Sequence, residues 1–457
     1  MQVHFIAIGG SAMHNLAIAL HRKGYAVTGS DDEIFEPSRS RLASHGILPD
    51  ALGWDAGRIN PGLDAVILGM HAKADNPELL RARELGLKIF SYPEYLYEQS
   101  KQKKRVVIAG SHGKTTITAM ILHVLREAGM DSDYMVGAQL EGFDVMVKLT
   151  EEAPVMVIEG DEYLTSPIDL RPKFHLYMPD IALLSGIAWD HINVFPTFEN
   201  YISQFETFIR LITPGGTLVW CSEDPDLRTI CESPRNDIRL LPYATPPFTI
   251  TNGVTSLLHD DGTSTAIRVF GRHNLANLEG ARLVCRELGI TDQVFYCAIA
   301  SFGGASKRLE KIAGNGERTV YKDFAHAPSK VQATLRAVRE QYPGSHVTAC
   351  LELHTYSSLN EQFMPHYAGT LDGADRALVY FNPHALQIKR LPDISPEQVA
   401  AGFAKEGLEV CTDSKELARK IMQERHPREV LLMMSSGNYD GIDLKAFATD
   451  WVNAPVG

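Results

Sequence analysis

One stretch near position 110 has the composition of a phosphate-binding loop. Gly110-Ser111-His112-Gly113-Lys114-Thr115-Thr116 follows the apolar run RVVIAG and opens a stretch that we expect to be helical. Glycines let backbone N–H groups face a phosphate, and a helix N-terminus adds partial positive charge. Lys114 would then reach the outer phosphates of a nucleotide, and the Thr115 hydroxyl would hold Mg²⁺. The alternative, a glycine-rich turn with a surface lysine, is disfavoured by the flanking strand and helix, although Ile108 replaces the first glycine of the general pattern.

Carboxylates follow the next apolar run along the chain. VMVIEG ends near Glu159, and Asp161 and Glu162 come directly after it. Ligands in open α/β sheets sit at the carboxyl ends of strands, and carboxylates there can bind Mg²⁺, although acids are also common turn residues. Asp190 and His191 follow the run IALLSG, so His191 is either a further member of such a site or a packed or capping residue.

Two further clusters could contact a nucleotide. Asn274 and Asn277 lie three residues apart in GRHNLAN, so a helix would place both on one side of its first turn, with amides suited to an adenine edge; simple N-capping by Asn274 is the alternative. Arg308 lies in SFGGASKRLE, and Asp323 and His326 lie in VYKDFAHAP. Asp, His and Arg at a strand-to-helix junction indicate a site, while a solvated loop is the alternative.

The N-terminal end of the chain carries a second glycine loop. Gly9-Gly10-Ser11 follows the first expected strand, and Ser30-Asp31 ends the second. The dinucleotide pattern Gly-x-Gly-x-x-Gly is absent, because position 11 is serine and position 14 is histidine. We therefore favour a site for some diphosphate at the helix N-terminus over a nicotinamide site.

Three blocks of alternating strands and helices would position these residues. In each block short apolar runs alternate with helical stretches, which is typical of parallel sheets covered on both faces. Helices are expected near residues 12–23, 37–45 and 76–85, from Lys114, over 274–300 as a pair, and near 328–340, 358–371, 414–425 and 441–452. Pro328 is expected in the first turn of its helix. The charged run Glu98–Arg105 is expected to be a linker, and Asp260-Asp261-Gly262 a hairpin turn.

Composition narrows the classes of protein. The 457 residues favour two to four domains, and the absence of an apolar stretch of about 18 residues argues against a membrane span. No secretory signal is recognised at the N-terminus. Six scattered cysteines without a Cys-x-x-Cys pair argue against a zinc cluster and fit a reducing cytosol. The net charge of −12 makes nucleic acid an improbable partner.

In their order along the chain, these motifs resemble the Mur ligase family over essentially the whole sequence. The motifs that carry the resemblance are AGSHGKTT, IEGDEY, WDH, GRHNLANLEGA, SFGGASKRLE and VYKDFAHAP. The stretches HFIAIGGSAM, GSDDEIFEP and MMSSGNYDGIDLKAF are most similar to the branch that serves peptidoglycan recycling. That branch joins UDP-N-acetylmuramate to L-Ala-γ-D-Glu-meso-diaminopimelate. The alternative is the branch that adds L-alanine in de novo synthesis.

The resemblance implies an α/β protein of three domains. A Rossmann-like domain over residues 1–100 would bind the UDP-sugar, a central P-loop ATPase-type domain over 101–301 would bind ATP, and a Rossmann-like domain over 302–457 would close over both and receive the amine. ATP would phosphorylate the lactyl carboxylate, and the amine would then displace phosphate. The enzyme would be cytoplasmic, a monomer or weak dimer, and would act on small-molecule substrates without inserting into a membrane.

The resemblance also assigns residues. Lys114, Glu159, His191 and Arg308 would be catalytic, with Mg²⁺ held by Thr115, Glu159 and His191. The family implies three binding sets: Gly110, Ser111, His112, Gly113, Lys114, Thr115, Thr116, His273, Asn274, Asn277, Arg308 and Asp323 for ATP; Gly9, Gly10, Ser11, Ser30 and Asp31 for the UDP-sugar; and His326, His354 and Asn438 for the amine or peptide.

Some positions depart from the family's pattern. Ser185 or Gly186, Ala188 and Asn193 stand where other members often carry Asn, Glu and Asp around Asp-His, so the outer shell of the metal site is altered. His354-Thr355-Tyr356-Ser357 looks more like the alanine-adding branch than the recycling branch. A P-loop NTPase that makes no amide, and a nicotinamide oxidoreductase, are the hypotheses from other classes.

Overall fold

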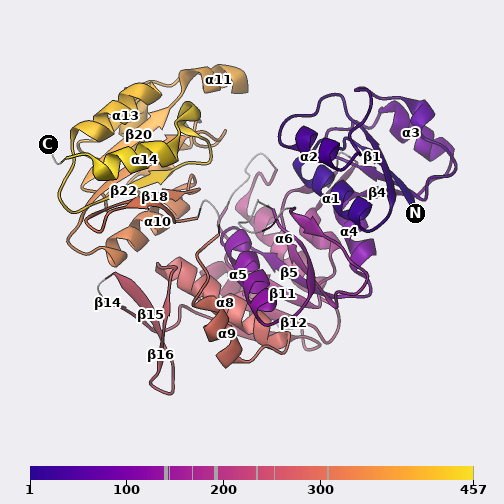
Figure 1. Ribbon diagram of the computed structural model, residues 1–457, viewed down its shortest axis with the longest axis horizontal. Helices are drawn as coiled ribbons and strands as arrows, with labels where there is room; N and C mark the ends of the chain where they lie inside the picture. Colours follow the sequence, from indigo (N-terminus) through magenta and orange to yellow (C-terminus); the bar gives the residue numbers. More distant parts are fainter. Residues whose placement is uncertain are drawn as a thin grey trace. The chain divides into compact units, whose positions relative to one another are not determined.

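The chain folds into two compact units of alternating strands and helices (Figure 1). The computed structural model describes residues 1–137, 143, 145–166, 168–189, 194–232, 235–251, 253–305 and 308–455. The first unit comprises Met1–Thr245 and Ala276–Ile299, and the second comprises Pro246–Leu275 and Ala300–Gly457. Within the described ranges no helix is long and apolar enough to cross a membrane.

The N-terminal part of the first unit is a four-stranded parallel sheet in the order β2-β1-β3-β4. Its strands are β1 (Gln2–Ile6), β2 (Ala26–Ser30), β3 (Ala65–Leu68) and β4 (Ile89–Ser91). Its helices are α1 (Ser11–Arg22), α2 (Ser38–Ser44), α3 (Pro77–Glu84) and α4 (Tyr92–Ser100), with a short 3₁₀ turn η1 (Ala56–Arg58). The first three helices confirm the sequence prediction. The chain leaves β1 toward β2 and returns to β3 on the other side, so the loop after β1 lies at a topological switch point.

A seven-stranded sheet forms the larger part of the first unit, in the order β13-β12-β11-β5-β8-β6-β7. All its pairs are parallel except β6 with β7. Its strands are β5 (Lys104–Ala109), β6 (Ser132–Met135), β7 (Val147–Lys148), β8 (Val155–Glu159), β11 (Ile181–Leu184), β12 (Thr217–Cys221) and β13 (Arg239–Tyr243). Because β5 lies between β8 and β11, the three predicted ligand-bearing segments leave adjacent strands at one edge of the sheet.

Further elements accompany this sheet. The helices are α5 (Lys114–Glu127), α6 (Phe198–Arg210), α7 (Pro225–Cys231), α8 (Arg272–Glu287) and α9 (Asp292–Ile299), and a small hairpin joins β9 (Leu164–Ser166) to β10 (Asp169–Pro172) before the turn η2 (Lys173–Leu176). The pair α8 and α9 confirms the prediction for residues 274–300. The first residues of α8 belong to the second unit and the rest to the first.

The predicted linker at Glu98–Arg105 has the right place between the two sheets, but its bounds are wrong. Helix α4 continues to Ser100 and β5 begins at Lys104, so only three residues separate them. Lys103 and Arg105 are buried rather than solvated. The Lys103 amine pairs with Asp133 at 2.8 Å, and the Arg105 guanidinium pairs with Asp180 at 3.3 Å. The segment is polar in composition, but Lys103 and Arg105 are buried because they form ion pairs with acidic residues elsewhere in the sheet.

The second unit contains two sheets. An antiparallel sheet is formed by β14 (Phe248–Thr251), β15 (Val254–Leu258) and β16 (Ser264–Ile267), and the predicted hairpin turn at 260–262 joins the last two strands. The main sheet has the order β17-β18-β22-β19-β20-β21. Its strands are β17 (Glu310–Gly314), β18 (Arg318–Asp323), β19 (His346–Leu353), β20 (Arg376–Phe381), β21 (Glu409–Cys411) and β22 (Glu429–Met434); only β17 is antiparallel to its neighbour.

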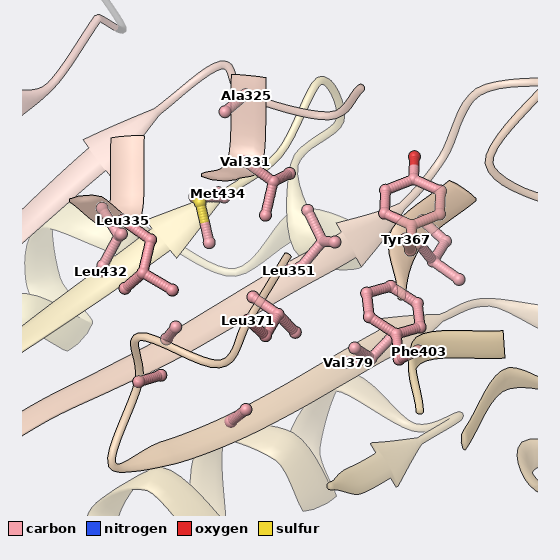
Figure 2. Close-up of a cluster of buried hydrophobic side chains, with 14 of the residues drawn as sticks. Ala325, Val331, Leu335, Leu351, Tyr367, Leu371, Val379, Phe403, Leu432 and Met434 are labelled. Atoms are coloured by element: carbon pink, nitrogen blue, oxygen red, sulfur yellow. The ribbon is translucent and has the colours of Figure 1, made fainter. Parts of the chain in front are cut away.

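Helices cover both faces of the main sheet of the second unit. They are α10 (Pro328–Gln341), α11 (Pro383–Lys389), α12 (Pro396–Phe403), α13 (Ser414–Gln423) and α14 (Leu444–Asn453), with 3₁₀ turns η3 (Met364–Tyr367) and η4 (Tyr439–Gly441). Pro328 begins α10 as predicted. Figure 2 shows one core, in which Val331 and Leu335 of α10 pack with Leu351 of β19 and Leu432 of β22. Since successive strand residues alternate between the faces, a second core lies behind the sheet.

The predicted helix at 358–371 is wrong. The segment forms successive turns, with only η3 as a regular element. Asn360 accepts a hydrogen bond from the Gln362 amide, Pro365 has no amide to donate, and Gly369 has a φ of +75°. Apolar residues of the segment, such as Tyr367 and Leu371 in Figure 2, are buried in the core, so their spacing resembled a helix although the backbone is irregular.

Candidate active site

The phosphate-binding loop connects β5 to α5 and requires its glycines. Gly110 has a φ of +118° and Gly113 a φ of +77°, conformations that other residues rarely adopt. A Cβ atom on Gly113 would also overlap the Asn277 amide oxygen, and one on Gly110 would overlap Ser185. The loop is fixed by the Ser111 amide, which donates to the Gly186 carbonyl at 2.9 Å. The predicted strand–loop–helix context is therefore present, with Asn277 against the loop.

Lys114 is held by acidic groups of the same edge. Its Nζ donates to Glu162 Oε2 at 2.7 Å and to the Gly110 carbonyl at 2.7 Å. Burial lowers the pKa of Lys114, but the carboxylates of Glu162, Asp161 and Glu159 outweigh it, and the net pKa is raised. Lys114 is thus a protonated, partly buried amine at the N-terminus of α5, suited to a phosphate.

Glu159 and Thr115 lie together at the ends of adjacent elements. The Thr115 hydroxyl donates to Glu159 Oε1 at 2.7 Å, and the Gly137 amide donates to Oε2 at 2.8 Å. Burial raises the pKa of Glu159, although these hydrogen bonds and Lys114 oppose the shift. A cation at this carboxylate would offset the cost of burying its charge.

The donor set is compatible with Mg²⁺, which takes oxygen ligands and usually keeps waters and phosphate oxygens beside one or two carboxylates. Glu159 and Thr115 supply such oxygens. Among the residues that the structure describes, no group of three or more His, Cys, Asp and Glu side chains is arranged for a metal ion. Asp190, His191 and Asn193 lie outside the described residues.

Tyr201 of α6 is a residue that the sequence reasoning missed. Its hydroxyl lies 2.8 Å from Ser111 Oγ and donates to Glu162 Oε1 at 3.4 Å. The Ala188 amide donates to the same Ser111 hydroxyl at 2.8 Å. A buried tyrosine in an amphipathic helix looks like a core residue in the sequence, so no pattern distinguished it. In the structure it links the phosphate loop to the carboxylate that binds Lys114.

The asparagines of α8 have different surroundings. Asn277 belongs to the first unit, where it contacts Gly113. Asn274 belongs to the second unit, and its amide donates to the Phe270 carbonyl at 2.9 Å. Helix α8 begins at Arg272, so the N-cap alternative for Asn274 is wrong. Burial lowers the pKa of His273, and the Asp323 carboxylate opposes that shift.

In the second unit, Asp323 organises the turn that carries Arg308. Its carboxylate accepts hydrogen bonds from the Leu309 amide at 2.6 Å and the Ala325 amide at 2.7 Å. The Arg308 guanidinium lies over the Phe324 ring, 4.5 Å from its centroid. His326 Nδ1 lies 2.8 Å from the Phe324 carbonyl oxygen. Arg308, Asp323 and His326, which come from two separate sequence motifs, therefore share one cluster at the end of β18.

Two further residues were predicted to bind the amine or peptide. They lie on neighbouring loops at the carboxyl edge of the main sheet of the second unit. His354 follows β19 and is about half exposed, with its Nδ1 3.9 Å from Glu352 Oε1. Asn438 follows β22, is exposed, and accepts a hydrogen bond from the Gly441 amide at 3.3 Å. Both side chains are accessible to a ligand.

The N-terminal loop brings most of its predicted residues to the start of α1. The Gly9 amide donates to Asp31 Oδ2 at 2.7 Å, and burial raises the pKa of Asp31, which the Gly9 hydrogen bond opposes. Gly10 and Ser11 begin α1, which has no side-chain cap. Ser30 differs from the prediction: it is fully buried, and its hydroxyl donates to Glu78. Its carbonyl accepts from the Ala7 and Ile8 amides, so Ser30 supports the loop from beneath.

Comparison with known families covers almost the whole chain. Residues 2–104 match the "Mur ligase family, catalytic domain", residues 108–285 the "Mur ligase middle domain", and residues 307–437 the "Mur ligase, glutamate ligase domain". These three matches follow the order in which the sequence motifs occur.

Similar proteins carry two different names. A UDP-N-acetylmuramate–L-alanine ligase of Arthrobacter sp. (strain FB24) is 34% identical over 393 residues, which cover 83% of this chain and 80% of that protein. A UDP-N-acetylmuramate–L-alanyl-γ-D-glutamyl-meso-2,6-diaminoheptandioate ligase of Haemophilus influenzae is 29% identical over 454 residues, which cover 97% of this chain and 98% of that protein.

Solved structures also resemble this fold. The ligase of the second kind from Neisseria meningitides is 27% identical with a TM-score of 0.59, over 66% of this chain and 98% of that chain. A UDP-N-acetylmuramate–alanine ligase from Thermotoga maritima, 20% identical, has a TM-score of 0.69 over 96% of both chains and supports the fold alone.

Proposed function

The chain belongs to the Mur ligase family of ATP-dependent acid–amino-acid ligases, and we propose that it joins UDP-N-acetylmuramate to L-Ala-γ-D-Glu-meso-diaminopimelate in peptidoglycan recycling. The observation that carries the activity is the group formed by Lys114, Thr115 and Glu159 at the carboxyl edge of the seven-stranded sheet. We further propose that the protein acts in the cytoplasm, where ATP and UDP-sugars are available.

Amide synthesis from a carboxylate needs activation, because a carboxylate has no good leaving group. In the proposed reaction a carboxylate oxygen of the UDP-sugar attacks the γ-phosphorus of ATP, and ADP leaves. The amine then attacks the acyl phosphate, and the tetrahedral intermediate expels phosphate. Lys114 would stabilise charge on the transferring phosphoryl group, since protonated amines and metal ions are the usual means of doing so.

The other candidate residues are assigned roles in binding the metal ion, ATP and the UDP-sugar. Thr115 and Glu159, with His191, would hold Mg²⁺, which when bound would neutralise negative charge on the phosphates. The loop amides of 110–116, together with His273, Asn274 and Asn277, would bind ATP. Arg308 and Asp323 would reach ATP from the C-terminal part of the chain, and closure would exclude water from the acyl phosphate. Gly9, Gly10, Ser11 and Asp31 would bind the UDP-sugar diphosphate, with Ser30 supporting that loop.

Each of the two candidate acceptors, the tripeptide and L-alanine, is supported by some observations. The motifs at the two ends of the chain and the near-complete coverage of the Haemophilus relative support the tripeptide. The higher identity of the Arthrobacter relative and the His354-Thr355-Tyr356 segment support L-alanine as the second candidate. His326, His354 and Asn438 are the residues that we propose to contact the acceptor in either case.

ADP release tests the proposal. Purified protein would receive ATP, Mg²⁺ and UDP-N-acetylmuramate, with the tripeptide in one reaction and L-alanine in the other. Turnover with the tripeptide alone would support the recycling function. Turnover with L-alanine alone would move the protein to de novo synthesis. ADP release that is independent of both acceptors and of the UDP-sugar would contradict ligase activity and favour a simple NTPase.

A further inference from the structure

Two buried glutamates lie at opposite edges of the main sheet of the second unit. Glu352 is near the carboxyl end of β19, and Glu429 is at the amino end of β22, the adjacent strand. Their exposed fractions are 3% and 1%. Each glutamate accepts hydrogen bonds from a side-chain hydroxyl and from a backbone amide, and each lies close to a histidine. The pair therefore allows one edge of the sheet to be compared with the other in almost the same chemical surroundings.

The glutamate at the amino edge has a structural arrangement. Glu429 accepts hydrogen bonds from the Thr348 hydroxyl at 2.5 Å and the His426 amide at 2.8 Å, and its Oε1 lies 3.4 Å from His346 Nδ1. The His346 ring stacks on the His426 ring at 3.7 Å between centroids. This cluster joins the starts of β19 and β22, far from the segments that carry candidate acceptor residues.

The glutamate at the carboxyl edge connects two loops instead. Glu352 Oε2 accepts from the Ser435 hydroxyl and from the Tyr439 amide, the latter at 2.9 Å. Its other oxygen lies 3.9 Å from His354 Nδ1, an ion-pair contact when the imidazole is protonated. Since His354 follows β19 while Ser435 and Tyr439 follow β22, this carboxylate is hydrogen-bonded to the loop after β22 and lies beside the histidine after β19.

The loop after β22 is shaped around this carboxylate. Tyr439 and Asp440 have φ angles of +50° and +56°, which are unfavourable for residues other than glycine. The fully buried Tyr439 hydroxyl lies 2.8 Å from the Met434 carbonyl oxygen, which fixes the loop. A Cβ atom on Gly437 would lie 2.9 Å from Glu352 Oε2 and 2.9 Å from His354 Nδ1. The absence of a side chain at Gly437 therefore lets the histidine and the carboxylate approach each other.

We propose that Glu352 is the positioning residue of the acceptor site, because it fixes His354 and the Asn438-bearing loop in the arrangement that receives the incoming amine. The proposal rests on the proposed function, which gives His354 and Asn438 their role. Glu352 itself is buried and acts through these two exposed residues. The carboxylate lies 3.9 Å from the His354 ring nitrogen and so limits the positions that the ring can take.

Kinetics of Glu352→Gln and Gly437→Ala, with Glu429→Gln as the matched control, test this role. Glutamine keeps the size of the side chain and one acceptor oxygen but removes the charge. We expect the acceptor KM of the first two variants to rise about tenfold to a hundredfold, because a displacement of binding groups by about 1 Å can have an effect of that size. Hydroxylamine attacks the acyl phosphate in place of the acceptor, forming a hydroxamate and releasing phosphate. Both variants should form this hydroxamate at the wild-type rate.

Glu429→Gln is expected to change thermal stability and leave the acceptor KM unchanged. An unchanged acceptor KM in folded Glu352→Gln, or an equal rise in Glu429→Gln, would overturn the proposal. If Glu352→Gln does not fold, the same test applies to Ser435→Ala, which removes only the hydroxyl that binds Glu352. Failure of the proposed function would appear differently, as wild-type protein that releases no ADP in response to an acceptor.

Discussion

The two edges of the seven-stranded sheet both bury charged side chains, yet they differ in how the charges are balanced. At the amino edge, Lys103 pairs with Asp133, and its Nζ also donates to the Thr150 carbonyl at 2.8 Å and the Ala153 carbonyl at 2.9 Å. Arg105 pairs there with Asp180 and donates to the Met178 carbonyl at 2.9 Å. Each cation therefore has a dedicated carboxylate and backbone acceptors.

The carboxyl edge is balanced differently. Lys114 faces Glu162 and lies near Glu159, while Asp161 pairs with Lys173 at 2.7 Å. Within the part of the chain that the structure describes, two amines thus face three carboxylates at this edge. Burial lowers the pKa of Lys114, but the neighbouring carboxylates outweigh that effect and raise it, whereas burial is the main cause of the raised pKa of Glu159. Glycines with positive φ, Gly110 and Gly113, adjoin these charges. Burial of charge alone does not indicate a site, whereas an excess of carboxylates over amines beside such a loop does.

The amino edge also contains a cavity of about 650 Å³. It is lined by basic side chains, including Lys101, Lys104 and Arg239, and by Asp180 and Glu287. Arg239 pairs with Glu287 at 2.9 Å, and Lys101 pairs with Glu98 at 2.6 Å. Most of its charged side chains therefore have ion-pair partners, in keeping with a structural edge.

Substitution of Lys103 should show the largest difference between the two edges, because it should reduce stability and leave activity unchanged. In Lys103→Met the buried Asp133 loses its cation, and we expect a loss of about 3–5 kcal/mol of stability. The fraction that remains folded should retain wild-type ADP release per molecule. Thermal unfolding and acceptor-dependent ADP release measure the two effects. Recovery of stability in Lys103→Met with Asp133→Leu would support the pairing, and a specific loss of activity would contradict a structural role.

Lys114→Ala should have the opposite profile. We expect ADP release to fall about 10²–10³-fold, because a charge that stabilises the transferring phosphoryl group is lost. The melting temperature should change less than in Lys103→Met. Lys104→Ala, an exposed lysine of the amino edge, is the matched control. Normal ADP release by Lys114→Ala would disprove the role assigned to its amine.

Gly113→Ala tests the loop rather than the charges. The left-handed conformation costs a Cβ-bearing residue roughly 1–2 kcal/mol, and the methyl group would overlap the Asn277 amide. We expect ATP to bind about tenfold more weakly or worse, as measured by calorimetry. Gly113→Ala with Asn277→Ala would relieve the overlap but not the backbone strain. Unchanged ATP affinity in the single variant would show that the loop does not contact the nucleotide.

The smallest expected effect concerns pH. Because burial raises the pKa of Glu159, the folded protein binds this proton more tightly than the unfolded chain does. Its contribution to stability is therefore fully present below the unfolded glutamate pKa of about 4.3 and is lost as pH rises through the folded pKa. Without nucleotide, Glu159→Gln should melt at a higher temperature than wild type at neutral pH, and the two should converge in acid. A constant difference across pH would contradict this interpretation.

Local patterns gave reliable predictions where local physics determines the structure. The phosphate loop, the start of α10 at Pro328 and the hairpin turn at Gly262 were all predicted, because each depends on the conformational limits of a few consecutive residues. The bounds of the linker at Glu98–Arg105 were wrong, as was the helix at 358–371. In both, the fate of the side chains depended on distant partners, such as Asp133 for Lys103 or the sheet core for Tyr367.

The sequence by itself determined the family, the alternating α/β architecture and the types of residue that the candidate sites contain. Tertiary structure alone decided that Tyr201 contacts Ser111, that Glu162 binds Lys114, and that Glu352 joins two loops. The physical reason is strand order. Ser435 is 83 residues from Glu352 in the chain, and the two meet because β22 returns to pair beside β19. That pairing is chosen by the packing of whole sheet faces, which no short stretch of sequence encodes.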